Sequence, residues 1–278
     1  MSGMNPLSRF SPLAYRASVA ALDFLLPPHC PGCAVTQPVP NQLCAECFLA
    51  CHFIAPPFCR VCGVPFPSDQ RVGPAGLCPT CIAQPRPFAA ARGALAYDGM
   101  ARTLILRFKN ASETGLAEFL APLMQRAGAD LLAKATLVVA VPLHQSRLRA
   151  RGYNQAVLLA RALARRAGLP LLPDALVRTH ATEKLRAATA RSRAETLSDA
   201  IAVRPARVPR LVGQNVVVID DVLTSGATLS ACAVALRSAG ATEVYGLAAA
   251  RVPDPQLRPA QASRLVSLGG AETPAGKH

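Results

Sequence analysis

The 278-residue sequence contains no tryptophan, and aromatic residues make up only 5% of it. Proteins that hold single-stranded nucleic acid by base stacking need aromatic rings, so a stacking platform is disfavoured. Acidic residues are also scarce: 16 Asp and Glu stand against 30 Lys and Arg, which leaves a formal charge of +14. This excess points to anionic partners such as phosphates, nucleotides or nucleic acid, and it says nothing about the fold.

No run of apolar residues is long enough to cross a membrane. The best candidate, residues 13–26, is interrupted by Arg16 and Asp23, whereas a span needs about 20 apolar residues. A small-residue cleavage site of the secretory type is also missing. We therefore expect an amphipathic N-terminal helix within residues 1–28 that packs on the rest of the protein, no membrane span, and a cytoplasmic location.

Hydrophobic residues make up 51% of the chain and charged residues 17%, which predicts a globular protein with a substantial core. The basic residues are concentrated in two stretches. Residues 144–166 contain six arginines and no acid, and residues 178–210 contain eight basic residues and three acids. Each stretch is either a solvated surface or an anion-binding surface.

Nine of the ten cysteines lie between residues 30 and 81, and eight of them form CxxC pairs. Disulfide frameworks rarely show such pairs, whereas a CxxC turn presents two thiolates to one metal ion. The sequence therefore predicts structural Zn²⁺ sites in a reducing compartment. The predicted ligands are Cys30, Cys33, Cys44, Cys47, Cys59, Cys62, Cys78 and Cys81.

Two turns complete one tetrahedral site, and the spacing leaves their pairing open. Sequential pairing joins the first two turns and the last two, and a crossed pairing is equally compatible with the spacing. Cys51 has no CxxC partner, and His29 and His52 are alternative ligands, although residues in such positions are more often bystanders. A redox role is disfavoured because redox CxxC motifs occur singly.

The chain divides by composition into four parts, the first of which is residues 1–28. Residues 29–84 hold the cysteines and form a double zinc ribbon; prolines and glycines at 65–90 mark the join to a second domain at 90–252. Residues 253–278 show no periodicity, and we expect a disordered tail. In the second domain, strands are predicted at 94–97, 137–143, 216–219 and 244–250, and helices at 101–109, 115–127, 154–167 and 226–239. This alternation predicts an α/β fold with a parallel sheet flanked by helices.

Ligands of such sheets bind beyond the carboxyl ends of the strands, which directs attention to DDVLTSGAT at residues 220–228. Gly226 relaxes the turn, so backbone NH groups and hydroxyls there are predicted to surround a phosphate at a helix N-terminus. Asp220 and Asp221 would repel a bare polyphosphate. They are expected to bind vicinal sugar hydroxyls or a bridging Mg²⁺.

Two other interpretations compete for this segment. An ordinary strand and capped helix would leave the acids solvated. A nucleotide hydrolase also places acids after an apolar strand, but its GxxxxGK[ST] loop occurs nowhere in the chain.

The segment VVVIDDVLTSGAT, residues 216–228, resembles the 5-phosphoribosyl-1-pyrophosphate (PRPP) signature of type I phosphoribosyltransferases. The resemblance implies that domain's fold, with Asp220 and Asp221 as catalytic residues that hold the ribose hydroxyls. It also implies that the 5-phosphate is held by Thr224, Ser225, Gly226, Ala227 and Thr228.

Over residues 22–250 the chain is similar to the ComF/GntX family of competence-associated proteins. The similarity rests on the CxxC-rich ribbon, on Phe108-Lys109, on VPLHQSRLRARGYNQA from Val141, and on the PRPP motif. It implies that the segment 144–152 is a loop facing the pyrophosphate of PRPP. The residues implied to bind there are Arg147, Arg149, Arg151 and Gly152, while Tyr153, Asn154 and Gln155 either cap the next helix or touch the ligand.

One family element departs from its pattern. The flexible loop T-x-x-Q-x-x-L-x-x-x-x-R-x-x-N aligns with Thr182, Leu185, Ala188, Arg193 and Thr196, so only its Thr and Arg are kept. This loop excludes water in transferases, and its change bears on turnover more than on PRPP binding. Lys184, Arg186, Arg191 and Arg193 remain available for phosphates.

Three functions are compatible with these features. The first is a Mg²⁺-dependent phosphoribosyltransferase, a glycosyltransferase, with an unidentified acceptor. The second, implied by the ComF resemblance, is a non-catalytic accessory protein of DNA uptake and natural transformation that binds PRPP and single-stranded DNA beside competence proteins. The third, a zinc-ribbon nucleic-acid binder with an inert α/β domain, leaves the sugar-phosphate motif unexplained.

Overall fold

The computed structural model describes residues 27–66, 73–110, 113–178, 201–254 and 257. The helix predicted within residues 1–28, almost all of the predicted tail and the flexible loop at 182–196 lie outside these ranges. Within them, no helix is long and apolar enough to span a membrane.

The larger part of the fold is a five-stranded sheet in which every neighbouring pair is parallel. Its order is β1 (Ala90–Ala96), β7 (Glu243–Arg251), β6 (Asn215–Leu223), β2 (Leu137–Ala140) and β3 (Leu171–Leu172). The side chains of Val216 through Ile219 in the central strand are all buried. Such a continuous apolar run is typical of a sheet covered on both faces, and it confirms the predicted α/β class.

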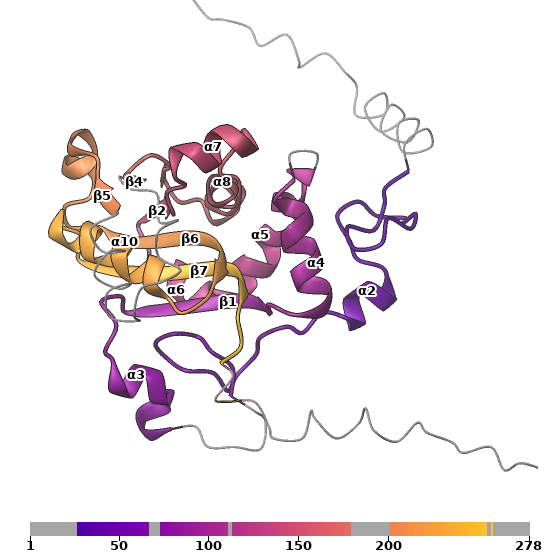
Figure 1. The fold of residues 1–278 in the computed structure, drawn as a ribbon, viewed down its shortest axis with the longest axis horizontal. Coiled ribbons are helices and arrows are strands. Elements are labelled where there is room, and N and C mark those ends of the chain that lie inside the picture. The colour runs from indigo at the N-terminus through magenta and orange to yellow at the C-terminus, as the bar shows by residue number, and fades with distance from the viewer. Residues whose placement is uncertain (1–26, 67–72, 111–112, 179–200, 255–256, 258–278) are drawn as a thin grey trace, which may run out of the picture.

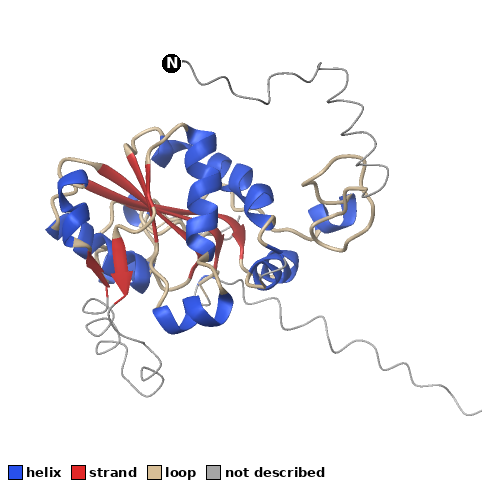
Figure 2. Cartoon of the chain, turned by 90° about the horizontal axis from the view of Figure 1, so that it is seen from above, coloured by secondary structure: helices blue, strands red, loops and turns tan. Residues whose placement is uncertain are grey.

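Helices cover the two faces of this sheet (Figure 2). They are α4 (Gly99–Phe108), α5 (Leu116–Ala127), α6 (Ala129–Leu132), α7 (Gln145–Arg151), α8 (Gln155–Ala167) and α10 (Ala227–Ser238), with a short η5 (Pro205–Arg210). Helix α5 packs against α8, β1 and β7, while α8 also contacts β2, β3 and β6. Helix α10 contacts β6, β7 and a separate antiparallel pair, β4 (Leu176–Arg178) and β5 (Ile201–Val203).

The cysteine-rich residues form two small units with little regular structure. Short helices are α2 (Ala45–Leu49), η2 (Pro74–Gly76) and α3 (Pro79–Ala83). Figure 1 shows the first unit, with α2, beside α4, and the second, with α3, below β1. The chain between them is joined to the sheet by a bridge of Phe53 with Leu95.

Several predicted strand boundaries need correction: β1 begins at Ala90 rather than at residue 94, and β2 ends at Ala140 rather than at residue 143. The strand predicted at 216–219 continues as β6 to Leu223, so both aspartates lie within it. Strand β7 continues alongside and pairs Asp220 with Ala248 and Leu223 with Arg251. The carboxylate of Asp220 also accepts a hydrogen bond from the next backbone NH at 2.8 Å.

The segment 144–152, predicted to be a loop, contains α7. His144 begins this helix by accepting a hydrogen bond at Nδ1 from the backbone NH of Ser146 at 3.2 Å. Gly152 ends it in the left-handed conformation, with φ of 81°, which glycine adopts without strain. A polar N-cap residue and a terminal glycine are local signals of a short helix. The loop implied by the family resemblance was therefore wrong.

Candidate functional site

The eight CxxC cysteines gather sequentially into two clusters. The first cluster is Cys30, Cys33, Cys44 and Cys47, and the second cluster is Cys59, Cys62, Cys78 and Cys81. Within each, the sulfur atoms lie within 4.8 Å of one another, and none forms a disulfide. The Sγ atoms of Cys33 and Cys44 are 3.7 Å apart and those of Cys62 and Cys78 are 3.6 Å apart. Zn–S bonds of about 2.3 Å in a tetrahedron place sulfurs about 3.8 Å apart, so both donor sets fit Zn²⁺.

Backbone NH groups point at one thiol of each cluster. The NH groups of Gly32 and Cys44 donate to Cys30 Sγ, both at 3.3 Å. Burial raises the pKa of the Cys30 thiol, but these donors outweigh burial and bring that pKa to about 6. A hydrogen bond from Cys62, aided by backbone NH groups, lowers the pKa of Cys59 to about 4. Each cluster therefore contains one thiol that ionises readily. In the same clusters, burial raises the pKa of Cys47 and Cys81, and the hydrogen bond with Cys59 raises the pKa of Cys62, so a full set of thiolates, the form that binds metal, needs a bound cation.

The alternative ligands lie outside both clusters. Cys51 is buried in the main hydrophobic core, and the Nδ1 atom of exposed His52 lies 2.9 Å from Asp98 Oδ1. Neither of these residues nor His29 belongs to a metal-compatible group within the described ranges. Cys232 on α10 is fully buried, as expected of a core residue.

The loop between β6 and α10, residues 224–226, which we call the β6–α10 loop, presents unpaired backbone donors. Gly226 has φ of 82°, a conformation that favours glycine. Among the described residues, none of the NH groups of Thr224, Ser225 and Gly226 donates a hydrogen bond. Free NH groups next to a twelve-residue helix are suited to binding an anion.

The acidic doublet, Asp220 and Asp221, lies at the carboxyl end of the sheet. Asp221 Oδ2 is 3.0 Å from Lys109 Nζ, at the end of α4. Burial, and then the charge of Asp221, raise the pKa of Asp220 well above its usual value. A cation or a set of hydroxyl donors bound here would stabilise the ionised pair.

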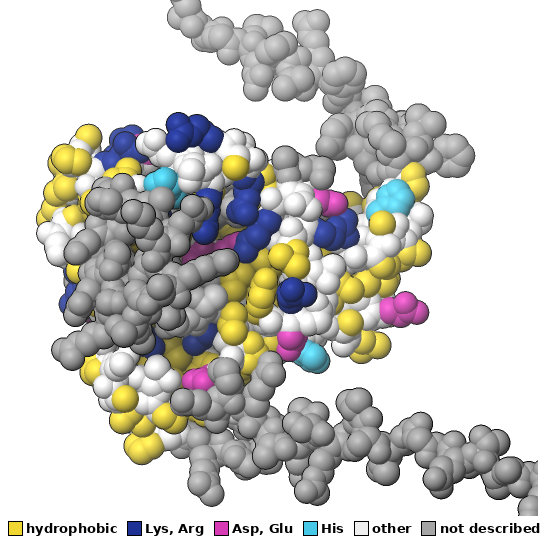
Figure 3. All heavy atoms as spheres, in the orientation of Figure 1, with side chains coloured by type: hydrophobic (Ala, Val, Ile, Leu, Met, Phe, Trp, Pro, Cys, Tyr) yellow, Lys and Arg dark blue, Asp and Glu magenta, His cyan; other side chains and the backbone are white. Residues whose placement is uncertain are grey.

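Cations from three elements surround the doublet. A pocket of about 170 Å³ is lined by both aspartates together with Lys109, Val141, Pro142, Leu143, Arg147, Arg151, Asn154, Gln155, Ala156, Arg178 and Thr228. Figure 3 shows Lys and Arg side chains gathered next to acidic ones on the face that carries α7. Burial, and then the charge of Arg147, lower the pKa of Arg178, because cations at this density destabilise one another without an anion.

The RGYNQ residues mainly build the site. Asn154 begins α8 by accepting from the NH of Ala156 at 2.9 Å, and its Nδ2 donates to the Val141 carbonyl at 3.0 Å. Tyr153 donates from its hydroxyl to the Phe108 carbonyl at 2.5 Å and so holds α4 beside α7. Gln155 lines the pocket and is only 3% exposed.

The structure brings together some of the predicted site residues and separates others. The doublet, Thr228, Arg147 and Arg151 share the pocket. Thr224 and Ser225 border a neighbouring hollow that reaches the second cluster, and exposed Arg149 lines neither space.

Sequence reasoning missed two cations in the pocket, Lys109 and Arg178. Lys109 was named only as part of a family motif, and Arg178 lay within a basic stretch without a predicted role in the site. The one available signal was the position of Lys109 at the end of a predicted helix.

Two family profiles match separate parts of the chain. Residues 21–82 match the double zinc ribbon domain, and residues 154–267 match the phosphoribosyl transferase domain. Together with the parallel sheet and the two four-cysteine clusters, they define a class of protein: a phosphoribosyl transferase domain joined to a double zinc ribbon.

Competence protein F of Haemophilus influenzae is 35% identical over 158 residues, which cover 53% of this chain and 67% of that protein. DNA utilization protein YhgH of Escherichia coli K12 is 36% identical over 107 residues, 38% of this chain and 45% of YhgH. Orotate phosphoribosyltransferase from Aeropyrum pernix overlaps 58% of this chain and 80% of its own, with 18% identity and a TM-score of 0.30. The chain belongs to the competence protein F family.

Proposed function

We propose that this protein binds PRPP at the carboxyl edge of the sheet and transfers its phosphoribosyl group to an acceptor. One arrangement carries the proposal: the β6–α10 loop, with its unpaired NH groups, directly follows the strand that holds the acidic doublet, and four cations line the pocket of that doublet. A sugar with an anion at each end needs this combination. An inert α/β domain would have no use for half-buried, mutually repelling charges at a strand end.

Each part of the ligand has a partner in this arrangement. The NH groups of the β6–α10 loop and the hydroxyls of Thr224, Ser225 and Thr228 would hold the 5-phosphate. Asp220 and Asp221 would accept hydrogen bonds from the ribose hydroxyls. Lys109, Arg147, Arg151 and Arg178 would hold the pyrophosphate, for which arginine is well suited.

The donor sets also indicate two metals with different roles. Sulfur tetrahedra fit structural Zn²⁺, whereas Asp220 and Asp221 beside a diphosphate would suit Mg²⁺, which prefers oxygen ligands. Bound Mg²⁺ would offset the repulsion between the two aspartates and assist the departure of the pyrophosphate.

The chemistry is a substitution at the anomeric carbon. A nitrogen atom of the acceptor forms the new bond to this carbon, while the bond to the pyrophosphate oxygen breaks and pyrophosphate leaves with the electron pair. The sugar acquires cationic character, so the residues act by positioning and by charge, and no protein nucleophile is required.

Calorimetric titration with PRPP, with and without Mg²⁺, tests the binding. We expect Asp220→Asn combined with Asp221→Asn to abolish binding while both zinc ions and the fold remain. Asp130→Asn is a matched control, because this half-exposed acid on α6 lines neither the pocket nor the neighbouring hollow. Unchanged PRPP affinity in the double variant would refute the site. A screen of nucleobases for pyrophosphate release then tests turnover.

A second function, binding of single-stranded DNA in uptake, is favoured by the exposed arginines of α7 and by relatives described as competence and DNA utilization proteins. Binding of oligonucleotides should then weaken steeply with salt. Arg149→Ala is the informative variant, because Arg149 is exposed and lies outside the pocket. Loss of DNA affinity with intact PRPP affinity would support a separate DNA surface, and unchanged DNA affinity would oppose it.

A further inference from the structure

Arg251, the last residue of β7, reaches two parts of the molecule that are distant in sequence. Its Nε donates to the Cys62 carbonyl at 3.2 Å, and its Nη2 lies 3.9 Å from Cys62 Sγ. Its Nη1 donates to the carbonyls of Leu223 at 3.2 Å, Val252 at 2.8 Å and Thr224. One guanidinium therefore joins the second cluster to the β6–α10 loop.

The charge of Arg251 is buried, since the residue is only 8% exposed. A buried cation needs a compensating charge. Four thiolates around one Zn²⁺ carry a net negative charge, and the sulfur of Cys62 lies against the guanidinium.

The contacts with the loop also orient it. In a trans peptide the carbonyl and the following NH point in opposite directions. Because Arg251 holds the carbonyls of Leu223 and Thr224, the NH groups of Thr224 and Ser225 must point away from it. These are two of the unpaired donors of the β6–α10 loop.

We propose that Arg251 is a positioning residue that couples the second zinc cluster to the anion-binding donors of the β6–α10 loop. This inference rests on the proposed function, because it assigns those donors to the 5-phosphate. It predicts reciprocal coupling: zinc in the second cluster strengthens phosphate binding, and bound phosphate protects that zinc.

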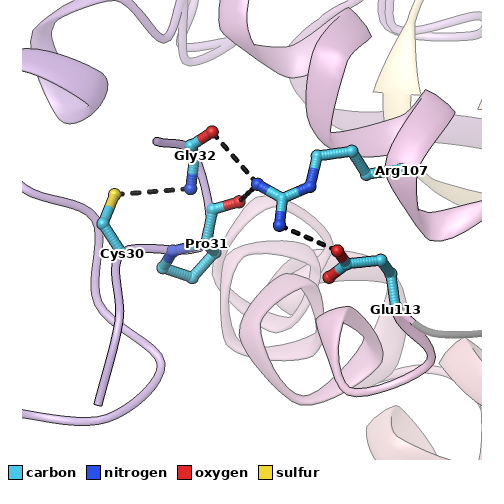
Figure 4. A network of polar contacts seen from close by, with 5 residues as sticks. All are labelled: Cys30, Pro31, Gly32, Arg107 and Glu113. Carbon is cyan, nitrogen blue, oxygen red and sulfur yellow. Dashed lines mark hydrogen bonds and ion pairs between the residues drawn. The ribbon is translucent and has the colours of Figure 1, made fainter. Parts of the chain in front are cut away.

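The first cluster offers a matched control. In Figure 4, Arg107 from α4 donates through Nη1 to the carbonyls of Pro31 at 2.6 Å and Gly32 at 3.1 Å, and it pairs with Glu113 at 2.9 Å. It therefore holds the Cys30–Cys33 turn of the first cluster much as Arg251 holds the Cys59–Cys62 turn of the second cluster. None of its recorded contacts is with the β6–α10 loop.

The experiment compares Arg251→Lys and Arg251→Met with Arg107→Met. Lysine keeps a charge near the thiolates but lacks the fork that reaches several carbonyls. We expect Arg251→Lys to retain two zinc ions and to bind PRPP about tenfold more weakly. In Arg251→Met, a chelator should also remove zinc from the second cluster faster than in the unaltered protein. In Arg107→Met, only removal of zinc from the first cluster should be faster. Wild-type PRPP affinity in zinc-loaded Arg251→Lys would overturn the proposal.

A measurement on the unaltered protein remains decisive if these variants fail to fold. Saturating PRPP should slow release of zinc from the second cluster and leave release from the first unchanged; equal rates with and without PRPP would overturn the coupling. Inorganic phosphate is titrated in parallel. Binding of phosphate without binding of PRPP would refute the proposed function, and the coupling is then read with phosphate as the probe.

Discussion

The two four-cysteine clusters arise from the same CxxC pattern but have different surroundings. In the first cluster Cys33 is exposed and Cys44 is half-buried. In the second cluster all four cysteines are buried, and they form a small core with Val64 and Phe66. The first contacts α4 through Arg107, whereas the second is joined to the ends of β6 and β7 through Arg251.

The spacing of the ligands and the structural importance of a cluster are therefore separate properties. Either tetrahedron needs only two turns of suitable spacing. Its contribution to the rest of the fold depends on what packs around it, and only the second cluster packs beside the proposed ligand site. The contribution of each cluster to stability and to ligand binding can be measured separately.

The largest effect is expected from removing each cluster in turn. Cys59→Ser with Cys62→Ser should destabilise the protein by about 4 kcal/mol or more, because metal loss here also opens a buried core. PRPP binding should be lost with it. Cys30→Ser with Cys33→Ser should leave the main unfolding transition and PRPP affinity nearly unchanged. Scanning calorimetry and titration measure both, and equal losses in the two variants would contradict the comparison.

The rate at which a chelator removes zinc should also differ between the two clusters. We expect a chelator to remove zinc from the first cluster about tenfold faster than from the second, because exposed ligands open with less disruption of packing. The absorbance of a zinc-chelator complex reports two phases, and the variant lacking the first cluster assigns them. A single phase in the unaltered protein would argue against different environments.

Substitution of Asp220 should change the pH dependence of stability without affecting the second zinc cluster. Its pKa is raised in the folded state, so the unfolded chain loses this proton first as pH rises, and stability falls through that range. Asp220→Asn should remove this fall and raise the thermal midpoint at neutral pH by a few degrees, without loss of zinc. Denaturant unfolding between about pH 4 and pH 7 measures the effect. If Asp220→Asn keeps the pH dependence of stability seen in the unaltered protein, the ionised form of Asp220 does not destabilise the fold.

The smallest effects concern the outer contacts of the second unit. Arg92 donates to the Arg60 carbonyl at 3.0 Å, pairs with Asp130 at 2.8 Å and lies over the Phe58 ring at 4.7 Å. Arg92→Ala should cost about 1 kcal/mol of stability. Asp130→Ala should cost less than about 0.5 kcal/mol, because this carboxylate is half-exposed. Equal costs would show that the ion pair, not the carbonyl and ring contacts, makes the connection.

Several features could be read from local patterns. Four CxxC pairs predicted the metal clusters, and apolar runs separated by helical segments predicted the parallel sheet. The anion-binding role of the segment 220–228 stays a prediction. Boundaries were less predictable: β6 extends through the acidic doublet because β7 pairs with it, and α7 occupies the predicted loop because His144 and Gly152 cap it.

Near neighbours in the chain were enough to predict the metal clusters and the strands, because CxxC turns and strand periodicity are local patterns. Which distant residues meet at one site depends on how the chain folds. Lys109 meets Asp221 across 112 positions, and Arg251 meets Cys62 across 189. No local pattern encodes such pairs, because they exist only once parallel strands bring the ends of distant segments to one edge of the sheet.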